Sequence, residues 1–169
     1  MTSRTAQEAA TVRRTVPAPF GPVHVVATDD AIVAIHWCDD VPDVPPCDSP
    51  HPVLDRAAEQ LAEYFAGTRS EFDLPLAPRG TPFQQRAWAA LREIPYGTTI
   101  SYGEQARRLG DPNKSRAIGA ANGRNPIPIV VPCHRVIGTN GKLTGFAGGL
   151  DVKAWLLAHE RRTSGQTLA

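Results

Sequence analysis

The sequence predicts an α+β protein made of two units, residues 1–79 and 80–169. Apolar and polar residues alternate near the N-terminus, as in a small antiparallel sheet, whereas the second unit carries repeated helix start and stop signals. The charge divides at the same place. Residues 1–79 hold 6 Lys or Arg against 12 Asp or Glu, and residues 80–169 hold 12 against 5. The basic unit could bind a polyanion such as nucleic acid, or could simply be a solvated face.

The composition is that of a soluble globular protein, with 41% hydrophobic and 21% charged residues. No run approaches the roughly 18 apolar residues of a membrane span, and the first 14 residues lack the apolar core of a secretory signal. The three cysteines, Cys38, Cys47 and Cys133, are too few and too scattered for a disulfide framework. We therefore expect a cytoplasmic protein, not associated with a membrane, whose thiols stay free to react.

The first unit should be a meander followed by one helix. Residues 12–40 alternate around two turn signals, as an antiparallel meander does. The proline-rich residues 41–52 form a loop. Apolar residues then follow helical spacing over 54–65, and Gly67 ends that helix. Residues 74–80, LPLAPRG, are expected to link the units.

The second unit begins and ends with a helix. In residues 81–95, Thr81 can cap the helix and Gln84 can complete a capping box. The glycine-rich residues 138–151 form a loop, and Asp151 at its end is expected to cap the last helix, VKAWLLAHERR.

Between these helices the sequence predicts a helix-turn-helix. A capping box of Ser101 and Glu104 begins a short helix that ends at Gly110, and Asn113 can cap a second helix over 114–124. Such pairs bind DNA or serve as plain packing units. The second helix places Arg116 in its first turn and small residues along its length, which permit close approach to a neighbouring helix or a nucleic-acid backbone: Ala117, Gly119, Ala120, Ala121 and Gly123.

Reactive chemistry is concentrated at Cys133. The apolar run between prolines in NPIPIVVPCHRVIG predicts a short buried strand that ends at Cys133, His134 and Arg135. A thiol attacks as thiolate, and a neighbouring base or cation raises the thiolate fraction. Successive strand side chains point to opposite faces, so Cys133 and His134 can cooperate only if the chain turns there. Glu160 on the last helix is the acid we expect to orient the imidazole. A cysteine hydrolase, a thiol-dependent transferase and a buried structural thiol all remain open.

Several collinear motifs carry a resemblance to a known family. PCHRV, GKLTGFAGG and WLLAHE, together with FQQRAWAALREIPYGTTISYGEQARRLG and SRAIGAANGRNP, closely resemble the O6-alkylguanine-DNA alkyltransferases. The resemblance covers about residues 80–162 strongly and the N-terminal unit loosely. It implies a small ribonuclease-H-like N-terminal domain of sheet plus helix, and a helical C-terminal domain with a winged helix-turn-helix-like core.

The resemblance implies DNA repair by irreversible, single-turnover transfer of an alkyl group from guanine O6 to Cys133, without a cofactor. O4-alkylthymine is a second candidate substrate. His134 would act as a base through a water and Glu160 would orient it. Tyr102 would supply a hydroxyl to the leaving guanine, and Asn125 would brace the turn before Cys133.

The resemblance also implies a DNA-binding mode. The alkylated nucleotide must leave the base stack and enter a pocket, and Arg116 would fill the gap while its helix lies in the minor groove. The partner is double-stranded DNA containing O6-alkylguanine, bound by a monomer that is nucleoid-associated in a prokaryote. The remaining implied DNA contacts are Ser115, Ala121, Gly123, Arg124 and Arg135, and the implied pocket residues are Val136, Phe146, Ala147 and Gly148.

Two other functions remain as alternatives. One is a helix-turn-helix damage-recognition module whose Cys133 is never alkylated, and the other is a cysteine hydrolase that turns over repeatedly. Some relatives bind zinc in the N-terminal domain. Cys38, Cys47 and His51 match no zinc spacing here, so no metal site is expected.

Overall fold

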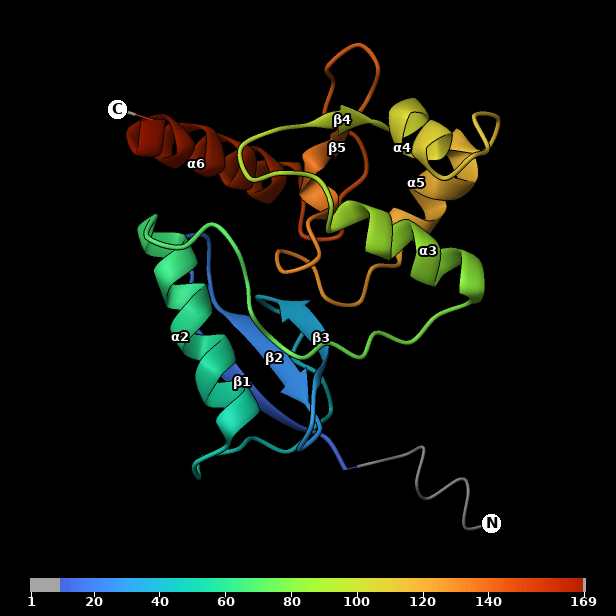
Figure 1. Cartoon of the computed structure of the whole chain (residues 1–169). Helices are drawn as coiled ribbons and strands as arrows, with labels where there is room; N and C mark the ends of the chain where they lie inside the picture. Colours follow the sequence, from blue (N-terminus) through green and yellow to red (C-terminus); the bar gives the residue numbers. More distant parts are fainter. Residues whose placement is uncertain (1–9, 169) are drawn as a thin grey trace, which may run out of the picture. The chain divides into compact units, whose positions relative to one another are not determined.

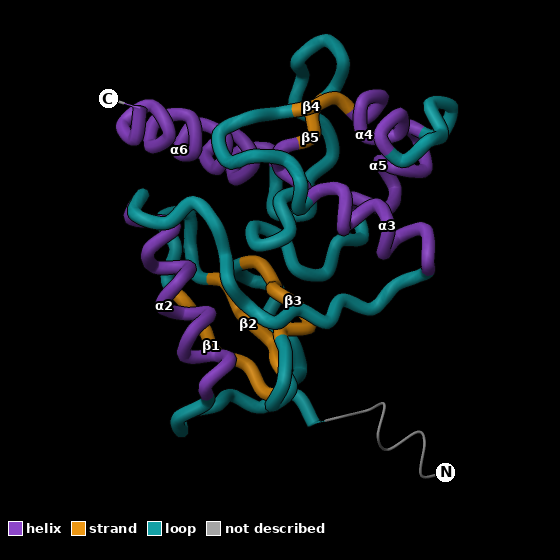
Figure 2. The backbone as a smooth tube through the Cα atoms, in the orientation of Figure 1, coloured by secondary structure: helices purple, strands orange, loops and turns teal. Residues whose placement is uncertain are grey.

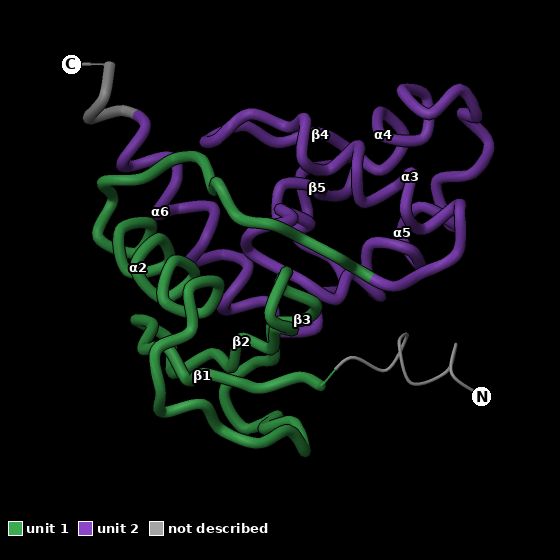
Figure 3. The backbone as a smooth tube through the Cα atoms, turned by 60° about the horizontal axis from the view of Figure 1, so that its bottom comes forward, with its two compact units in different colours: residues 1–78 green, residues 79–169 purple. Residues whose placement is uncertain are grey.

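The computed structural model describes residues 10–168 and divides the chain into two compact units, Met1–Pro78 and Arg79–Ala169 (Figure 3). A small sheet with a helix makes up the first and a mainly helical arrangement the second, which confirms the α+β class. Residues 1–9, part of the segment considered above for a secretory signal, lie outside the described residues. In the part that is described, no helix is long and apolar enough to span a membrane.

The first unit is a three-stranded antiparallel meander with one helix against it (Figure 1). The helix packs on the first two strands. Its first turn is capped by His51, whose Nδ1 accepts from the backbone N–H of Leu54, and Gly67 ends it in the left-handed conformation at φ 82°. The predicted meander and helix are confirmed. The elements are β1 Val12–Val16, β2 Val23–Ala27, β3 Ile32–Trp37 and α2 Pro52–Ala66.

Part of the expected linker belongs to the first unit's sheet. The N–H of Ile32 donates to the carbonyl of Pro75 at 2.9 Å, and the N–H of Ala77 donates to the carbonyl of Ile32 at 2.8 Å. These bonds form an isolated bridge beside the start of β3. Residues 74–77 are therefore fixed by backbone hydrogen bonds to the first unit and do not form a free linker between the units.

Three short helices, α3, α4 and α5, lie together in the second unit (Figure 2), and small apolar side chains are buried between them. Ala87, Ala106, Ile118 and Ala121 are buried together, with Phe83 and Leu109 packed against them. The Thr81–Gln84 capping box at the start of α3 is complete, as predicted. The elements are α3 Pro82–Leu91, β4 Ile100–Ser101, α4 Tyr102–Arg108, α5 Ser115–Gly123, β5 Val136–Ile137 and α6 Leu150–Leu168.

Buried amide groups fix the geometry of the helix-turn-helix. Gln105 on α4 and Asn122 on α5 exchange two side-chain hydrogen bonds, of 3.1 and 2.8 Å. Trp88 on α3 donates its indole N–H to the carbonyl of Ala121 at 2.8 Å. All three bonds are buried, where polar groups are costly unless paired, so they specify one arrangement of α3, α4 and α5.

Three predicted helix starts differ in detail. The N-cap of α5 is Lys114 rather than Asn113, and no side chain caps it. Ser101 caps α4 by accepting from the N–H of Glu104, whose carboxylate pairs with arginines one turn later instead of closing the box. Helix α6 begins at Leu150, so Asp151 lies in its first turn, where a carboxylate favours the helix dipole.

The prediction of a strand before Cys133 is wrong. This segment turns back on itself, with a bridge between Pro128 and Val131 and a positive φ of 73° at Ile129. Cys133–Arg135 then form one turn of 3₁₀ helix, η1. The prolines explain the difference, because each lacks an N–H and cannot contribute a donor to a sheet ladder.

Candidate active site

Cys133 and His134 share the short 3₁₀ helix η1, and both are buried. Side chains of successive residues in a 3₁₀ helix differ in direction by about 120°, not the roughly 180° of a strand. In this local turn the side chains of Cys133 and His134 therefore do not point to opposite faces, as they would in a strand, and the two residues can cooperate. Asn125 holds this turn, since its amide donates to the carbonyl of Val131 at 2.8 Å and accepts from the N–H of Ile127 at 3.0 Å.

His134 and Glu160 form a buried pair, as the sequence predicted. His134 Nε2 lies 2.6 Å from Glu160 Oε2, and both side chains are at most 1% exposed. An ionised carboxylate only accepts hydrogen bonds, so Nε2 carries the imidazole proton. Nδ1 is then the basic nitrogen, and among the described residues it has no hydrogen-bond partner. The imidazole is thus prepared to accept a proton at Nδ1.

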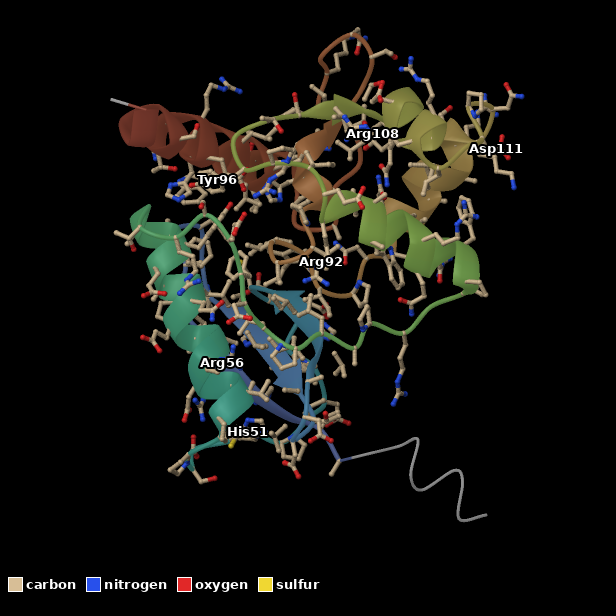
Figure 4. All side chains as sticks on the ribbon, viewed as in Figure 1. His51, Arg56, Arg92, Tyr96, Arg108 and Asp111 are labelled. Carbon is tan, nitrogen blue, oxygen red and sulfur yellow. The ribbon has the colours of Figure 1, made fainter. Side chains whose placement is uncertain are left out.

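Arg135 does not lie on a DNA-facing surface, and that prediction requires correction. Its side chain is buried and donates from two nitrogens to Glu160, at 2.8 and 3.1 Å, and from a third to the carbonyl of Ile94 at 2.7 Å. The guanidinium carbon also lies 5.6 Å from the ring centroid of Tyr96, which Figure 4 shows beside α6. Arg135 therefore compensates the buried carboxylate rather than a phosphate.

The electrostatics of this pair keep Glu160 ionised and His134 neutral. Burial alone would raise the pKa of Glu160, but its hydrogen bonds to His134 and Arg135 outweigh this and hold that pKa well below its usual range. Burial lowers the pKa of His134, only partly offset by Glu160. At neutral pH the site therefore holds a base with its acceptor nitrogen available.

The thiol is stored in its neutral form. Burial raises the pKa of Cys133, and the amide of Asn125 and the charge of Lys153 offset only part of this rise. A neutral thiol is a weak nucleophile, so the attack needs a proton acceptor. His134 is the base nearest in sequence.

Lys153 is a site residue that sequence reasoning missed. Its side chain is fully buried, and Nζ donates to the carbonyls of Val136, at 2.7 Å, and Thr144, at 3.0 Å. Burial lowers the pKa of Lys153, whereas the Cys133 thiolate raises it. A signal was available: Lys153 lies seven residues before Glu160, and positions seven apart share one helix face.

A cavity of about 620 Å³ opens beside α4 and α5. Tyr102, Ser115 and Arg116 line it, so the structure brings together one expected catalytic residue and two expected DNA contacts. The Tyr102 ring packs beside Gly119, where a Cβ would lie in ordinary contact, 3.8 Å from two ring carbons. The other lining residues are Gly103, Gly119, Gly138, Thr139, Thr144 and Gly145.

The expected pocket residues are placed differently. Val136 is fully buried and offers its carbonyl to Lys153, and its role in the pocket stays a prediction. Phe146 lies next to Lys153, with Nζ 6.0 Å from its ring centroid. Phe146, Ala147 and Gly148 directly follow the lining residue Gly145, and their pocket role stays a prediction.

The residues expected to contact DNA differ in their exposure to solvent. Arg116, Gly123 and Arg124 are exposed on or just after α5, and Ser115 is half-buried. Ala121 is only 3% exposed and belongs to the helix core, so a direct DNA contact by its side chain is not supported.

Metal ligands do not gather in the described part of the chain. Among residues 10–168, no three His, Cys, Asp or Glu side chains are placed to hold a metal ion. Cys47 contacts Ser49, whereas Cys38 contacts the carbonyl of Phe20.

Family models match both units. Residues 82–162 match the DNA-binding domain of 6-O-methylguanine DNA methyltransferase, and residues 11–78 match its ribonuclease-like domain. The chain therefore belongs to the 6-O-methylguanine DNA methyltransferase family, as the motifs around Cys133 indicated.

Individual relatives support the same family assignment. The chain is 62% identical over 112 residues to a methylated-DNA–protein-cysteine methyltransferase of Mycolicibacterium paratuberculosis, covering 66% of this chain and 68% of the relative. It is 46% identical over 161 residues to that of Mycobacterium tuberculosis, covering 88% and 91%. Crystal structures of the M. tuberculosis O6-methylguanine methyltransferase, alone and in complex with DNA, both superpose with a TM-score of 0.83. They are 43% and 44% identical and cover 90% and 89% of this chain, and 94% and 93% of theirs.

Proposed function

We propose that this protein repairs double-stranded DNA by transferring an alkyl group from guanine O6 to Sγ of Cys133. The transfer happens once per molecule and needs no cofactor. The family assignment supports DNA repair by alkyl transfer. The site adds the particular residues. We further propose that the protein works as a monomer in the cytoplasm, where its three cysteines stay free.

One observation carries the assignment of Cys133. It shares a single helical turn with His134, whose Nε2 is fixed by Glu160 and whose Nδ1 is buried without a protein partner among the described residues. A structural imidazole would pair both nitrogens, because an unpaired buried polar atom is costly. An imidazole that must accept a proton, directly or through a water, needs one nitrogen unpaired.

The chemistry follows in one displacement. The thiol proton passes to Nδ1 of His134 through a water, Sγ of Cys133 bonds to the alkyl carbon, and the bond from that carbon to O6 breaks. The electron pair remains on guanine, which takes a proton from the hydroxyl of Tyr102. The proton held by His134 then restores that hydroxyl through solvent. The net products are a thioether and an unmodified guanine.

The DNA side of the proposal rests on α5. The lesion is extruded into the cavity beside Tyr102. Arg116 is exposed in the first turn of α5 and lines the same cavity, so it can enter the space that the extruded base leaves. Arg124 and the bare backbone at Gly123 extend this surface along the helix.

The test is to locate the alkyl group. Protein incubated with duplex DNA containing O6-methylguanine is digested and mapped by mass spectrometry. The peptide with Cys133 should gain one methyl group, whereas Cys38 and Cys47 serve as internal controls and should gain none. Cys133→Ala should abolish transfer and retain DNA binding. Binding of the lesion with an unmodified Cys133 in the wild-type protein would instead indicate a damage-recognition module.

A further inference from the structure

The hydroxyl of Tyr102 is itself held by a second hydroxyl. Thr144, in the loop before α6, donates from Oγ1 to the Tyr102 oxygen at 3.2 Å. Both residues line the cavity beside α5. The two side chains are 42 positions apart in the sequence, so nothing local in the chain predicted this bond.

The backbone of Thr144 is fixed from behind. Its carbonyl accepts from Nζ of Lys153, which also donates to the carbonyl of Val136, just after the turn that holds Cys133. The same Nζ lies 5.9 Å from the ring centroid of Tyr102. Lys153 therefore connects three elements of the site: the chain after Cys133, the loop at Thr144, and the Tyr102 ring.

The direction of the hydroxyl bond decides what Tyr102 can do. A phenol carries one proton and acceptor lone pairs on the same oxygen. When Thr144 donates to that oxygen, the proton of Tyr102 is not used in this bond and is available to a group in the cavity. Donation into the oxygen also strengthens the phenol as a donor, because hydrogen bonds in a chain polarise one another.

We propose that Thr144 is a positioning residue that turns the Tyr102 proton towards the leaving guanine. This inference rests on the proposed function. As the carbon–O6 bond breaks, its electron pair moves onto guanine and the Tyr102 proton neutralises it, while Thr144 stabilises the oxygen that gives the proton up. Thr144 makes no bond to the alkyl group and acts only through Tyr102.

A set of variants tests the inference with the full-length protein and free O6-benzylguanine, which needs no DNA contact. Thr144→Val keeps the shape of the side chain and removes the donor, so benzyl transfer to Cys133 should slow by about three- to tenfold, the value of one neutral hydrogen bond. Thr144→Ser restores the donor and should react within about twofold of the wild-type rate. Thr98→Val is the matched control, because it removes an exposed threonine hydroxyl that bonds to the carbonyl of Pro95 outside the cavity.

A double-mutant cycle separates positioning from simple packing. If Thr144 acts through Tyr102, Thr144→Val should have no further effect in a Tyr102→Phe background. An equal slowing in both backgrounds, or a Thr144→Val rate equal to wild type, would overturn the inference while the proposed function stands. A wild-type protein that gained no benzyl group on Cys133 would overturn the proposed function and this inference with it.

Discussion

Burial raises the pKa of Cys133, in a chain whose relatives are named methylated-DNA–protein-cysteine methyltransferases. A permanently ionised thiolate would be open to oxidation and to any small electrophile. Burial keeps the proton on sulfur, and the unpaired Nδ1 of His134 supplies the place to which it can go. On the proposed mechanism, the thiol becomes nucleophilic only as its proton passes to His134.

Arg116 gives the sharpest test at the level of one side chain. Arg116→Ala should slow repair of O6-methylguanine in duplex DNA far more than benzyl transfer from free O6-benzylguanine. The physical reason is the unstacking of a base pair, a cost of a few kcal/mol that the free base never meets. Single-turnover rates with both substrates provide the measurement.

Arg124→Ala is the matched control for this test, because it removes the same charge at the other end of α5. It should weaken DNA binding and leave the rate at saturating DNA nearly unchanged. Equal slowing of both substrates by Arg116→Ala would assign Arg116 to the cavity or the fold.

The His134–Glu160 pair makes the second unit sensitive to acid. In the unfolded chain the pKa of His134 is near 6.5 and that of Glu160 near 4.3, and folding lowers both. As the pH falls through these values, the unfolded chain takes up protons that the folded chain resists, so the free energy of unfolding falls. Urea titrations at pH 7.5, 6 and 5 should show this loss, followed by Trp88 and Trp155 fluorescence in a Trp37→Phe background.

The His134→Asn variant serves as the comparison in those titrations. It removes the group that titrates between pH 7.5 and 5, so its stability should depend less on pH in that range. The same pH dependence in both proteins would show that other groups cause it.

At the scale of elements, α6 positions the site through one face. Lys153, Leu156 and Glu160 are all buried, and Lys153 and Glu160 bind the two ends of the segment that follows Pro132. Lys153→Met keeps the length of the side chain but leaves the carbonyls of Val136 and Thr144 without this donor. It should lower the free energy of unfolding by about 2–4 kcal/mol and slow transfer severalfold.

Lys142→Met, at the exposed tip of the preceding loop, is the control for Lys153 and should change neither property. Urea unfolding and the rate of Cys133 alkylation measure the two effects. If Lys153→Met had the same free energy of unfolding and the same alkylation rate as Lys142→Met, the hydrogen bonds from Lys153 to the two carbonyls would have no role in holding the site.

Sequence patterns predicted those elements whose signals are local. The meander, α2, the Thr81 capping box and the choice of Glu160 as the partner of His134 all follow from periodicity, caps and a buried helix face. The turn before Cys133 was missed, because the apolar residues suggested a strand while the prolines prevented one. The roles of Arg135 and Thr144 depend on side-chain partners 25 and 42 positions away, which no local pattern encodes. Lys153 could have been found from the helix face that it shares with Glu160.

At the scale of the whole molecule, charge separates the two units. The exposed basic side chains Lys114, Arg116 and Arg124 lie along or beside α5 in the second unit, whereas the first unit carries the excess of acids. Several of the unit's cations are already paired. Arg107 and Arg108 pair with Glu104, and Lys114 lies 3.6 Å from the carboxylate of Asp111, which Figure 4 shows at the turn between α4 and α5. DNA binding should therefore depend on only part of the unit's positive charge.

This distribution predicts salt-dependent, sequence-independent binding. Each phosphate contact contributes about 0.9 to the log–log slope of affinity against salt, so four contacts would give about −3.6. Arg124→Gln should make the slope shallower by about 0.9. Fluorescence anisotropy on two unrelated duplexes, from 50 to about 200 mM salt, measures both. An affinity that did not change with salt would contradict the electrostatic account.

The stoichiometry of the reaction distinguishes an alkyl acceptor from an enzyme that turns over repeatedly. A thioether has no good leaving group, so water cannot regenerate the Cys133 thiol as it would hydrolyse an acyl-enzyme thioester. With about a tenfold excess of duplex DNA containing O6-methylguanine, repaired guanine should stop at one equivalent per protein, and fresh protein should restart the reaction. Continued turnover beyond one equivalent, with Cys133 unmodified at the end, would contradict this prediction.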